Sequence, residues 1–160
     1  MEPAHYRDAM SRYAGHVQLV TTQWQGVRRG VTITAACSVS DSPATVLVCL
    51  NNTNAKNDIF TESGVFALNA LGARHQGLAD AFSGKTQLST EERFAAGSFE
   101  TLQTGAPVLV DALAAFDCRI VEISRGSTHN IFFGEVVAVR FSAPQPALLY
   151  MHRDYHSLGR

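Results

Sequence analysis

The most regular pattern of hydrophobic and polar positions lies between Gly30 and Asn51. From Val31 to Ser38, apolar and small hydroxyl-bearing residues alternate with a period of two, which is typical of a β-strand. A Ser-Asp-Ser-Pro turn follows at 40–43, and Thr45–Leu50 is nearly all apolar, as in a strand buried on both faces. The stretch therefore predicts two strands joined by a short turn, with a shelf of small side chains on which a flat polar ring could lie.

The remaining pattern predicts further strands and a few short helices. Strands are expected at His16–Trp24, Val65–Leu71, Phe99–Leu102, Leu113–Glu122, Ile131–Phe141 and Ala147–Met151. Helices are expected at Pro3–Tyr13, Ala55–Glu62, Ala73–Phe82 and Glu91–Ala96. Gln25-Gly26 is expected to form a hairpin turn, and Gly134 to mark a bulge or a close backbone approach. Arg153–Leu158 is expected to form an irregular tail.

This succession of elements indicates a mainly β protein with short helices, either an antiparallel barrel or a sandwich. No β-α-β alternation and no Gly-x-Gly-x-x-Gly motif is present, so a Rossmann domain is not expected. The length of 160 residues predicts one domain that spans residues 1–160.

Charge and hydropathy exclude several classes of partner. The net charge is −1 and no basic run occurs, so neither nucleic acid nor an anionic membrane surface is an expected partner. No apolar stretch approaches the roughly 20 residues that span a bilayer. The N-terminus lacks the pattern of a secretory signal, and a cytoplasmic location is expected.

The three cysteines, Cys37, Cys49 and Cys118, all lie in apolar strand patterns. Their number is odd and no Cys-x-x-Cys pair occurs, so neither a disulfide framework nor a metal site is expected. They are expected to be small buried residues, with the alternative that Cys37 and Cys49 line a ligand site.

Three further segments carry polar groups suited to binding. Asn51-Asn52-Thr53-Asn54 precedes an expected helix and suits either an anion or plain N-capping. Ser83-Gly84-Lys85 is too short for a Walker motif, and its lysine is either a phosphate ligand or a solvated side chain. His129 lies in an expected loop and is, from its position alone, either a surface residue or a functional one.

Four segments occur in the order found in one family: Tyr6–Met10, Ile33–Asn51, Ser127–His129 and Tyr155–Leu158. Through them the chain resembles the short-chain flavin reductases, the flavin reductase-like family with an FMN-binding split barrel. It is most similar to reductase components of two-component flavin-dependent monooxygenases, such as the 4-hydroxyphenylacetate 3-monooxygenase reductase and the pyrimidine-utilisation flavin reductase. Asp154 departs from the arginine that is frequent at its position in the family. The resemblance implies an antiparallel, Greek-key-like split β-barrel.

The resemblance also implies an activity. The chain would be an NAD(P)H:flavin oxidoreductase that passes a hydride from NADH or NADPH to FMN or FAD. It would form a homodimer and supply reduced flavin to a partner monooxygenase. The alternatives are a flavin-binding reductase of another acceptor, such as a cobalamin or a ferric complex, and a non-catalytic flavin-binding barrel.

The resemblance assigns roles to individual residues of this sequence. His129 would orient the nicotinamide or bond a flavin edge, and the aromatic ring of Tyr155 would pack near the active site. The expected flavin contacts are Thr32, Ile33, Thr34, Ala35, Ala36, Cys37, Ser38, Cys49, Leu50, Asn51, Thr53, Ser83, Gly84 and Lys85.

Overall fold

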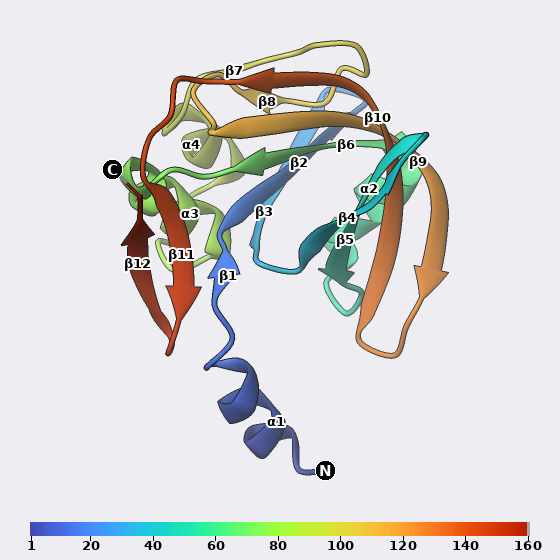
Figure 1. Cartoon of the computed structure of the whole chain (residues 1–160). Coiled ribbons are helices and arrows are strands. Elements are labelled where there is room, and N and C mark those ends of the chain that lie inside the picture. The colour runs from blue at the N-terminus through green and yellow to red at the C-terminus, as the bar shows by residue number, and fades with distance from the viewer. Residues whose placement is uncertain (160) are drawn as a thin grey trace.

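The computed structural model describes residues 1–159 and is dominated by one antiparallel sheet (Figure 1). Its seven strands run in the order β3 (Val27–Ile33), β2 (Gln18–Trp24), β6 (Val65–Ala70), β9 (Ala114–Arg125), β10 (His129–Phe141), β5 (Ala44–Asn51) and β4 (Ala36–Asp41). Two smaller sheets comprise β1 (Gly15–His16), β11 (Ala147–Met151) and β12 (Asp154–Leu158), and β7 (Phe99–Glu100) with β8 (Val108–Leu109). The helical segments are α1 (Pro3–Met10), η1 (Ala55–Asn57), α2 (Asp58–Ser63), η2 (Ala73–His75), α3 (Gln76–Ser83) and α4 (Thr90–Ala95). The predicted mainly β class is confirmed.

The barrel closes at a corner of the chain formed by Thr34 and Ala35. β3 and β4 follow one another in sequence, but they form opposite edges of the seven-stranded sheet. The Cys49 amide donates to the Ala35 carbonyl at 2.9 Å, which extends the β4–β5 pairing to the corner. The prediction of one strand over Val31–Ser38 is therefore wrong, because the period of two continues across a corner that separates two strands.

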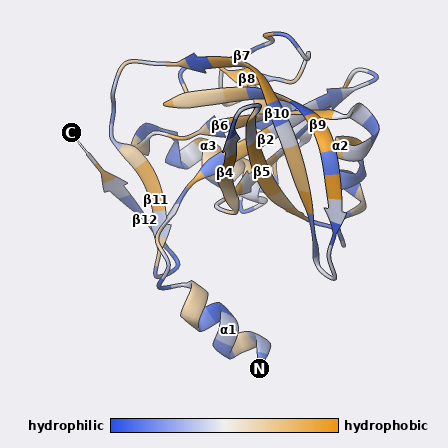
Figure 2. Ribbon diagram, turned by 45° about the vertical axis from the view of Figure 1, so that its right-hand side comes forward, coloured by the Kyte–Doolittle hydropathy of each residue, from blue (hydrophilic) through white to orange (hydrophobic). Residues whose placement is uncertain are grey.

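The strands of the sheet contribute side chains to two hydrophobic clusters. On β2, Leu19 contributes to a cluster beneath α3 and α4, whereas its neighbour Val20 contributes to the barrel interior with Leu50 and Phe132. Figure 2 shows hydrophobic residues concentrated on the strands of the sheet. Burial of both faces of β2 explains why this strand carries consecutive apolar residues.

Several local predictions are confirmed. The side chain of Asn54 accepts a hydrogen bond from the Lys56 amide at 3.1 Å and caps η1. Gly64 ends α2 in the left-handed conformation, with φ of 69°. At Gly134, a Cβ atom would lie 2.5 Å from the Phe66 ring, and the β9–β10 register shifts there. The absence of a side chain thus lets the bulged strand pack onto the barrel core.

Other predictions need correction. β5 is not buried on both faces, because half-buried residues alternate with the buried Val46, Val48 and Leu50. Cys37 is exposed rather than buried, because it lies on the edge strand β4. The expected tail is largely the strand β12, which pairs with β11.

Asp117 is an acidic residue of β9 that lies inside the fold. Its side chain is fully buried and accepts hydrogen bonds from the amides of Gln103 and Thr104 at 2.7 and 2.9 Å. The hydrogen bonds replace the water that the carboxylate loses and fix the loop before β8.

The helix α1 projects from the rest of the chain (Figures 1 and 2). It ends at Met10, earlier than the predicted Tyr13, and none of its residues is buried. Within residues 1–159, no helix combines the length and hydrophobicity needed to cross a membrane.

Candidate functional site

Two cavities lie beside the strand β3 and share Thr32 and Ser83 in their walls. The Thr32 hydroxyl donates to the Ala79 carbonyl at 2.8 Å, so this side chain ties β3 to α3 between the two cavities. We call the larger one, of about 630 Å³, the cationic cavity. The smaller one, of about 220 Å³, is the tyrosine cavity.

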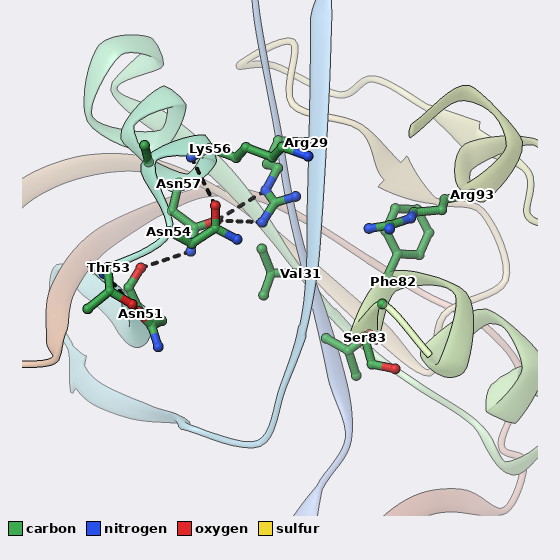
Figure 3. A pocket seen from close by; sticks show the side chains of 13 residues that line it. Arg29, Val31, Asn51, Thr53, Asn54, Lys56, Asn57, Phe82, Ser83 and Arg93 are labelled. Atoms are coloured by element: carbon green, nitrogen blue, oxygen red, sulfur yellow. Dashed lines mark hydrogen bonds between the residues drawn. The ribbon is translucent and has the colours of Figure 1, made fainter. Parts of the chain in front are cut away.

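The cationic cavity is named for Arg29, Lys56 and Arg93, which line it from β3, η1 and α4. Among the described residues, no carboxylate lines this cavity or forms an ion pair with these three side chains. Figure 3 shows Arg29 and Lys56 on one side of the hollow and Arg93 with Phe82 on the other. Three cations without an acidic partner make a site suited to an anion such as a phosphate.

A buried amide holds Arg29 in place. The Oδ1 atom of Asn57 accepts two hydrogen bonds from the Arg29 guanidinium, at 3.1 and 2.9 Å, and its Nδ2 atom donates to the Asn51 carbonyl at 2.9 Å. The Asn51 side chain in turn accepts from the amide and hydroxyl of Thr53, at 2.8 and 2.7 Å. The predicted residues Asn51 and Thr53 therefore belong to the same hydrogen-bonded wall as Arg29.

Arg93 reaches the cavity because aromatic packing fixes α4. Phe94 packs against the rings of Phe82 and Phe99, with centroid separations of 4.9 and 5.0 Å. Phe82 itself lies over Gly30, where a Cβ atom would come within 2.5 Å of its ring. The small residue on β3 thus allows α3 and α4 to approach the strand, and the Ser89 capping box begins α4 at the correct place.

Burial and a neighbouring positive charge act on Arg29. Burial lowers the pKa of the Arg29 guanidinium below its ordinary value, and the nearby positive charge of Arg93 lowers it further. An anion bound between the two guanidinium groups would relieve this repulsion. The electrostatics therefore favour a negatively charged ligand group in this part of the site.

The tyrosine cavity is more apolar and its charges are paired. Asp80 accepts a hydrogen bond from the Tyr155 hydroxyl at 2.9 Å and forms an ion pair with Lys85 at 3.3 Å. The Lys85 ammonium also lies 5.0 Å from the centre of the Tyr155 ring. Burial, and then the hydrogen bond and negative charge of Asp80, raise the pKa of Tyr155. Tyr155 and Lys85 are thus neighbours, but Lys85 lines this cavity and not the cationic one.

In the structure, the predicted shelf corresponds to the surface around the Thr34–Ala35 corner. Ile33 and Thr34 line the tyrosine cavity, Thr34 and Ala35 are exposed, and Ala36 is half-buried. Cys37 and Ser38 are exposed on β4 and line neither cavity. The shelf is open, and its small side chains leave the backbone of the corner accessible to a planar ligand.

The partner strand β5 contributes less to this surface than expected. The Leu50 side chain is buried in the barrel interior, so only its backbone could contact a ligand. Cys49 is half-buried, and burial followed by the proximity of Cys37 raises the pKa of its thiol.

His129 lies at the start of β10, directly opposite Asn51 on β5. Its ring Nδ1 is 3.0 Å from the Thr128 hydroxyl, and the side chain is exposed. Asn52 fixes this loop. Its side chain donates a hydrogen bond to the Gly126 carbonyl at 2.8 Å, and its backbone amide donates one to the Thr128 carbonyl at 2.9 Å. The structure thus brings His129 next to the wall of the cationic cavity, although it lines neither cavity.

Sequence reasoning missed the groups that define the cationic cavity: Arg29, Lys56, Asn57 and Arg93. It also missed Asp80, which neutralises Lys85. The adjacent pair Arg28-Arg29 on a strand that precedes the shelf was a usable signal. Arg93 had none, because only the folded chain brings α4 beside β3.

Comparison with known proteins places this geometry in a family. The family model described as "Flavin reductase like domain" matches residues 10–159. The chain belongs to the flavin reductase-like family.

Individual relatives agree with this assignment. An Agrobacterium fabrum protein named FMN reductase (NADH) RutF is 48% identical over 96% of this chain and 87% of its own length. The structure of the flavin reductase PheA2 has a TM-score of 0.90 at 31% identity and covers 100% of both chains. BorF, the flavin reductase component of a bacterial two-component tryptophan halogenase, has a TM-score of 0.91 at 25% identity and covers 99% of both chains.

These similarities confirm the resemblance read from the sequence. They also confirm the split β-barrel fold and the expected class, an NAD(P)H-dependent flavin reductase. No group of three or more His, Cys, Asp or Glu side chains within residues 1–159 could hold a metal ion. The roles of single residues in this flavin reductase rest on the cavities described above.

Proposed function

We propose that this flavin reductase uses NADH to reduce FMN, with the flavin phosphate in the cationic cavity and the ring over the Thr34–Ala35 corner. The observation that carries the proposal is the set of three cations, Arg29, Lys56 and Arg93, without a carboxylate partner among the described residues. FMN carries one phosphate at the end of a chain attached to a planar ring. A cationic hollow that adjoins an open shelf of small residues fits that shape and charge.

The residues present fit this ligand on physical grounds. Charge-assisted hydrogen bonds from guanidinium groups are the strongest contacts that side chains offer a phosphate. Asn51, Thr53 and Ser83 line the same cavity and offer neutral polar groups to the hydroxyls between ring and phosphate. The name of the Agrobacterium fabrum relative, which specifies FMN and NADH, supports the choice of both molecules.

Bound flavin supplies a hydride acceptor, and the protein supplies alignment. In our proposal Arg29 and Arg93 hold the phosphate end, which fixes the position of the ring along β3. The open surface beside His129 receives the nicotinamide, and His129 orients it. No general acid or base is required for the hydride step itself.

We further propose that the reduced flavin leaves to serve a separate monooxygenase, in the cytoplasm. The similarity to BorF, which is the reductase component of a two-component halogenase, supports this division of labour.

The expected homodimer is also a proposal, supported by α1, which buries none of its residues against its own chain. Light scattering of the purified protein tests it, and a monomer would contradict it.

The reaction is tested by mixing protein, FMN and NADH under nitrogen and following the absorbance of oxidised flavin. We expect a loss of absorbance that depends on protein and is slower with NADPH. No loss with either nucleotide would contradict the proposal. Tight flavin binding without turnover would select the non-catalytic barrel instead, and faster reduction of an added cobalamin or ferric complex would select the other alternative.

A further inference from the structure

A second hollow continues from the cationic cavity toward the turn between β2 and β3. It has a volume of about 540 Å³ and shares Arg29, Ala55 and Lys56 with the cationic cavity. We call it the outer groove. Its size lies within the roughly 300–1,000 Å³ that is typical of small-molecule sites. The shared residues make the two hollows one continuous depression.

The strand β3 orders the parts of this depression. Thr32 and Val31 line the cationic cavity, Arg29 lines both hollows, and Val27 lines only the outer groove. A strand rises about 3.3 Å per residue, so Thr32 and Val27 are roughly 17 Å apart. A ligand that begins at the corner can therefore extend past Arg29 into the outer groove.

The outer groove exposes an aromatic ring. Trp24, at the end of β2, is 42% exposed, and its partner in the strand register, Val27, is 59% exposed. Both side chains line the groove. A half-exposed indole beside an aliphatic side chain offers a face on which a planar base can stack.

The charges of the groove are unevenly placed. Its shared end carries Arg29 and Lys56, whereas the carboxylates of Asp58 and Glu62 line only the outer part. A negatively charged ligand group is therefore favoured at the shared end. The carboxylates suit groups that donate hydrogen bonds, such as sugar hydroxyls or an amine.

Arg28 adds little free charge to the groove. Its guanidinium pairs with Glu91 at 2.9 Å and lies 4.3 Å from the centre of the Phe94 ring. The positive charge available to a ligand therefore comes from Arg29 and Lys56, at the boundary between the two hollows.

We infer that the outer groove binds the adenosine 5′-diphosphate half of a dinucleotide, with the base on Trp24 and the diphosphate at Arg29 and Lys56. This inference rests on the proposed function. FAD, which the site would then accept besides FMN, is the favoured source, because its adenosine half continues from the phosphate that the cationic cavity would hold in either flavin. NADH carries the same unit, so the experiment separates the two sources.

The first experiment uses Trp24 as a reporter, since it is the only tryptophan of the chain. Purified protein without flavin is titrated with ADP, and with inorganic pyrophosphate as the control that lacks the base. We expect a saturable change of tryptophan emission with ADP and a smaller one with pyrophosphate. No saturable change with ADP would overturn the inference. This readout does not depend on enzyme activity, so it is separate from a failure of the proposed reaction.

The second experiment compares flavins in Trp24→Leu and in the matched control Val121→Ala, which truncates an exposed apolar residue of β9. Base–aromatic stacking contributes ~1–3 kcal/mol, so Trp24→Leu should weaken FAD by about tenfold relative to FMN. A higher KM for NADH, with FMN as acceptor and FAD affinity unchanged, would assign the adenosine half to the nicotinamide nucleotide. Equal loss of FMN and FAD, or conversion of a dimer to a monomer without a nucleotide effect, would overturn the inference.

Discussion

The cationic cavity and the tyrosine cavity share two residues of their walls, yet they differ in how charge is compensated. In the first, Arg29, Lys56 and Arg93 have no carboxylate partner among the described residues. In the second, Lys85 forms an ion pair with Asp80, which also accepts a hydrogen bond from the Tyr155 hydroxyl. The difference teaches that a cation near a site is informative only once its partners are known. An unpaired cation favours an anionic ligand, whereas a paired one maintains the local structure.

The comparison is sharpened most by removing an unpaired cation. Arg93→Ala should weaken FMN by roughly 10- to 100-fold, because hydrogen bonds to charged groups contribute ~1.5–3 kcal/mol. Riboflavin, which lacks the phosphate, should bind almost unchanged. Quenching of flavin fluorescence measures both affinities.

Arg119→Ala is the control for this variant, because it removes an exposed arginine of β9 outside both cavities. An equal loss of FMN and riboflavin affinity in Arg93→Ala would show that the variant disturbs the shape of the site. Phosphate binding by Arg93 would then be contradicted.

His129 tests whether the nicotinamide binds on the open surface beside the cationic cavity. His129→Ala should lower NADH-dependent turnover by about tenfold through poorer alignment, with a smaller effect on FMN affinity. Stopped-flow reduction under nitrogen and flavin titration give the two quantities. If turnover and flavin affinity fell by the same factor, a nicotinamide role for His129 would be untenable.

The Lys85→Ala variant tests whether the ion pair with Asp80 keeps this cation from binding the flavin phosphate. Because the Lys85 side chain is exposed and paired with Asp80, Lys85→Ala should change FMN affinity by less than about threefold, as expected for surface charges. The same titration as for Arg93 applies. A loss as large as that in Arg93→Ala would move the phosphate toward the tyrosine cavity.

Tyr155 gives the smallest expected effect, on stability at high pH. The pKa of Tyr155 is raised in the folded state. The neutral phenol therefore stabilises the folded protein fully below the unfolded pKa of about 10, and this stabilisation is lost as the pH rises above 10 toward the folded pKa. The Tm of the wild type should therefore fall more steeply above pH ~10 than that of Tyr155→Phe. The same dependence of Tm on pH in the two proteins would contradict the part-buried hydrogen bond to Asp80.

Sequence patterns were sufficient where one segment determines its own structure. The cap at Asn54, the end of α2 at Gly64 and the close approach at Gly134 depend on neighbouring residues or on the lack of a side chain. Predicted elements such as β6 and α3 follow directly from hydrophobic periodicity.

The same patterns failed where distant segments meet. The alternation from Val31 to Ser38 cannot show that the chain changes sheet edge at Thr34, because side-chain period does not specify the partner strand. The buried carboxylate of Asp117 accepts hydrogen bonds from backbone amides of a loop that precedes it in the chain. Arg93 reaches the site from a helix whose hydrophobic pattern is weak. Ion pairing of Lys85 likewise becomes visible only in the folded chain.

A crystal structure of the protein soaked with FMN tests the central claim most directly. We predict the phosphate within hydrogen-bonding distance of Arg29 and Arg93, and the flavin ring along the Thr34–Ala35 corner. A phosphate bound at Lys85 in the tyrosine cavity, or a ring bound away from the corner, would contradict the account.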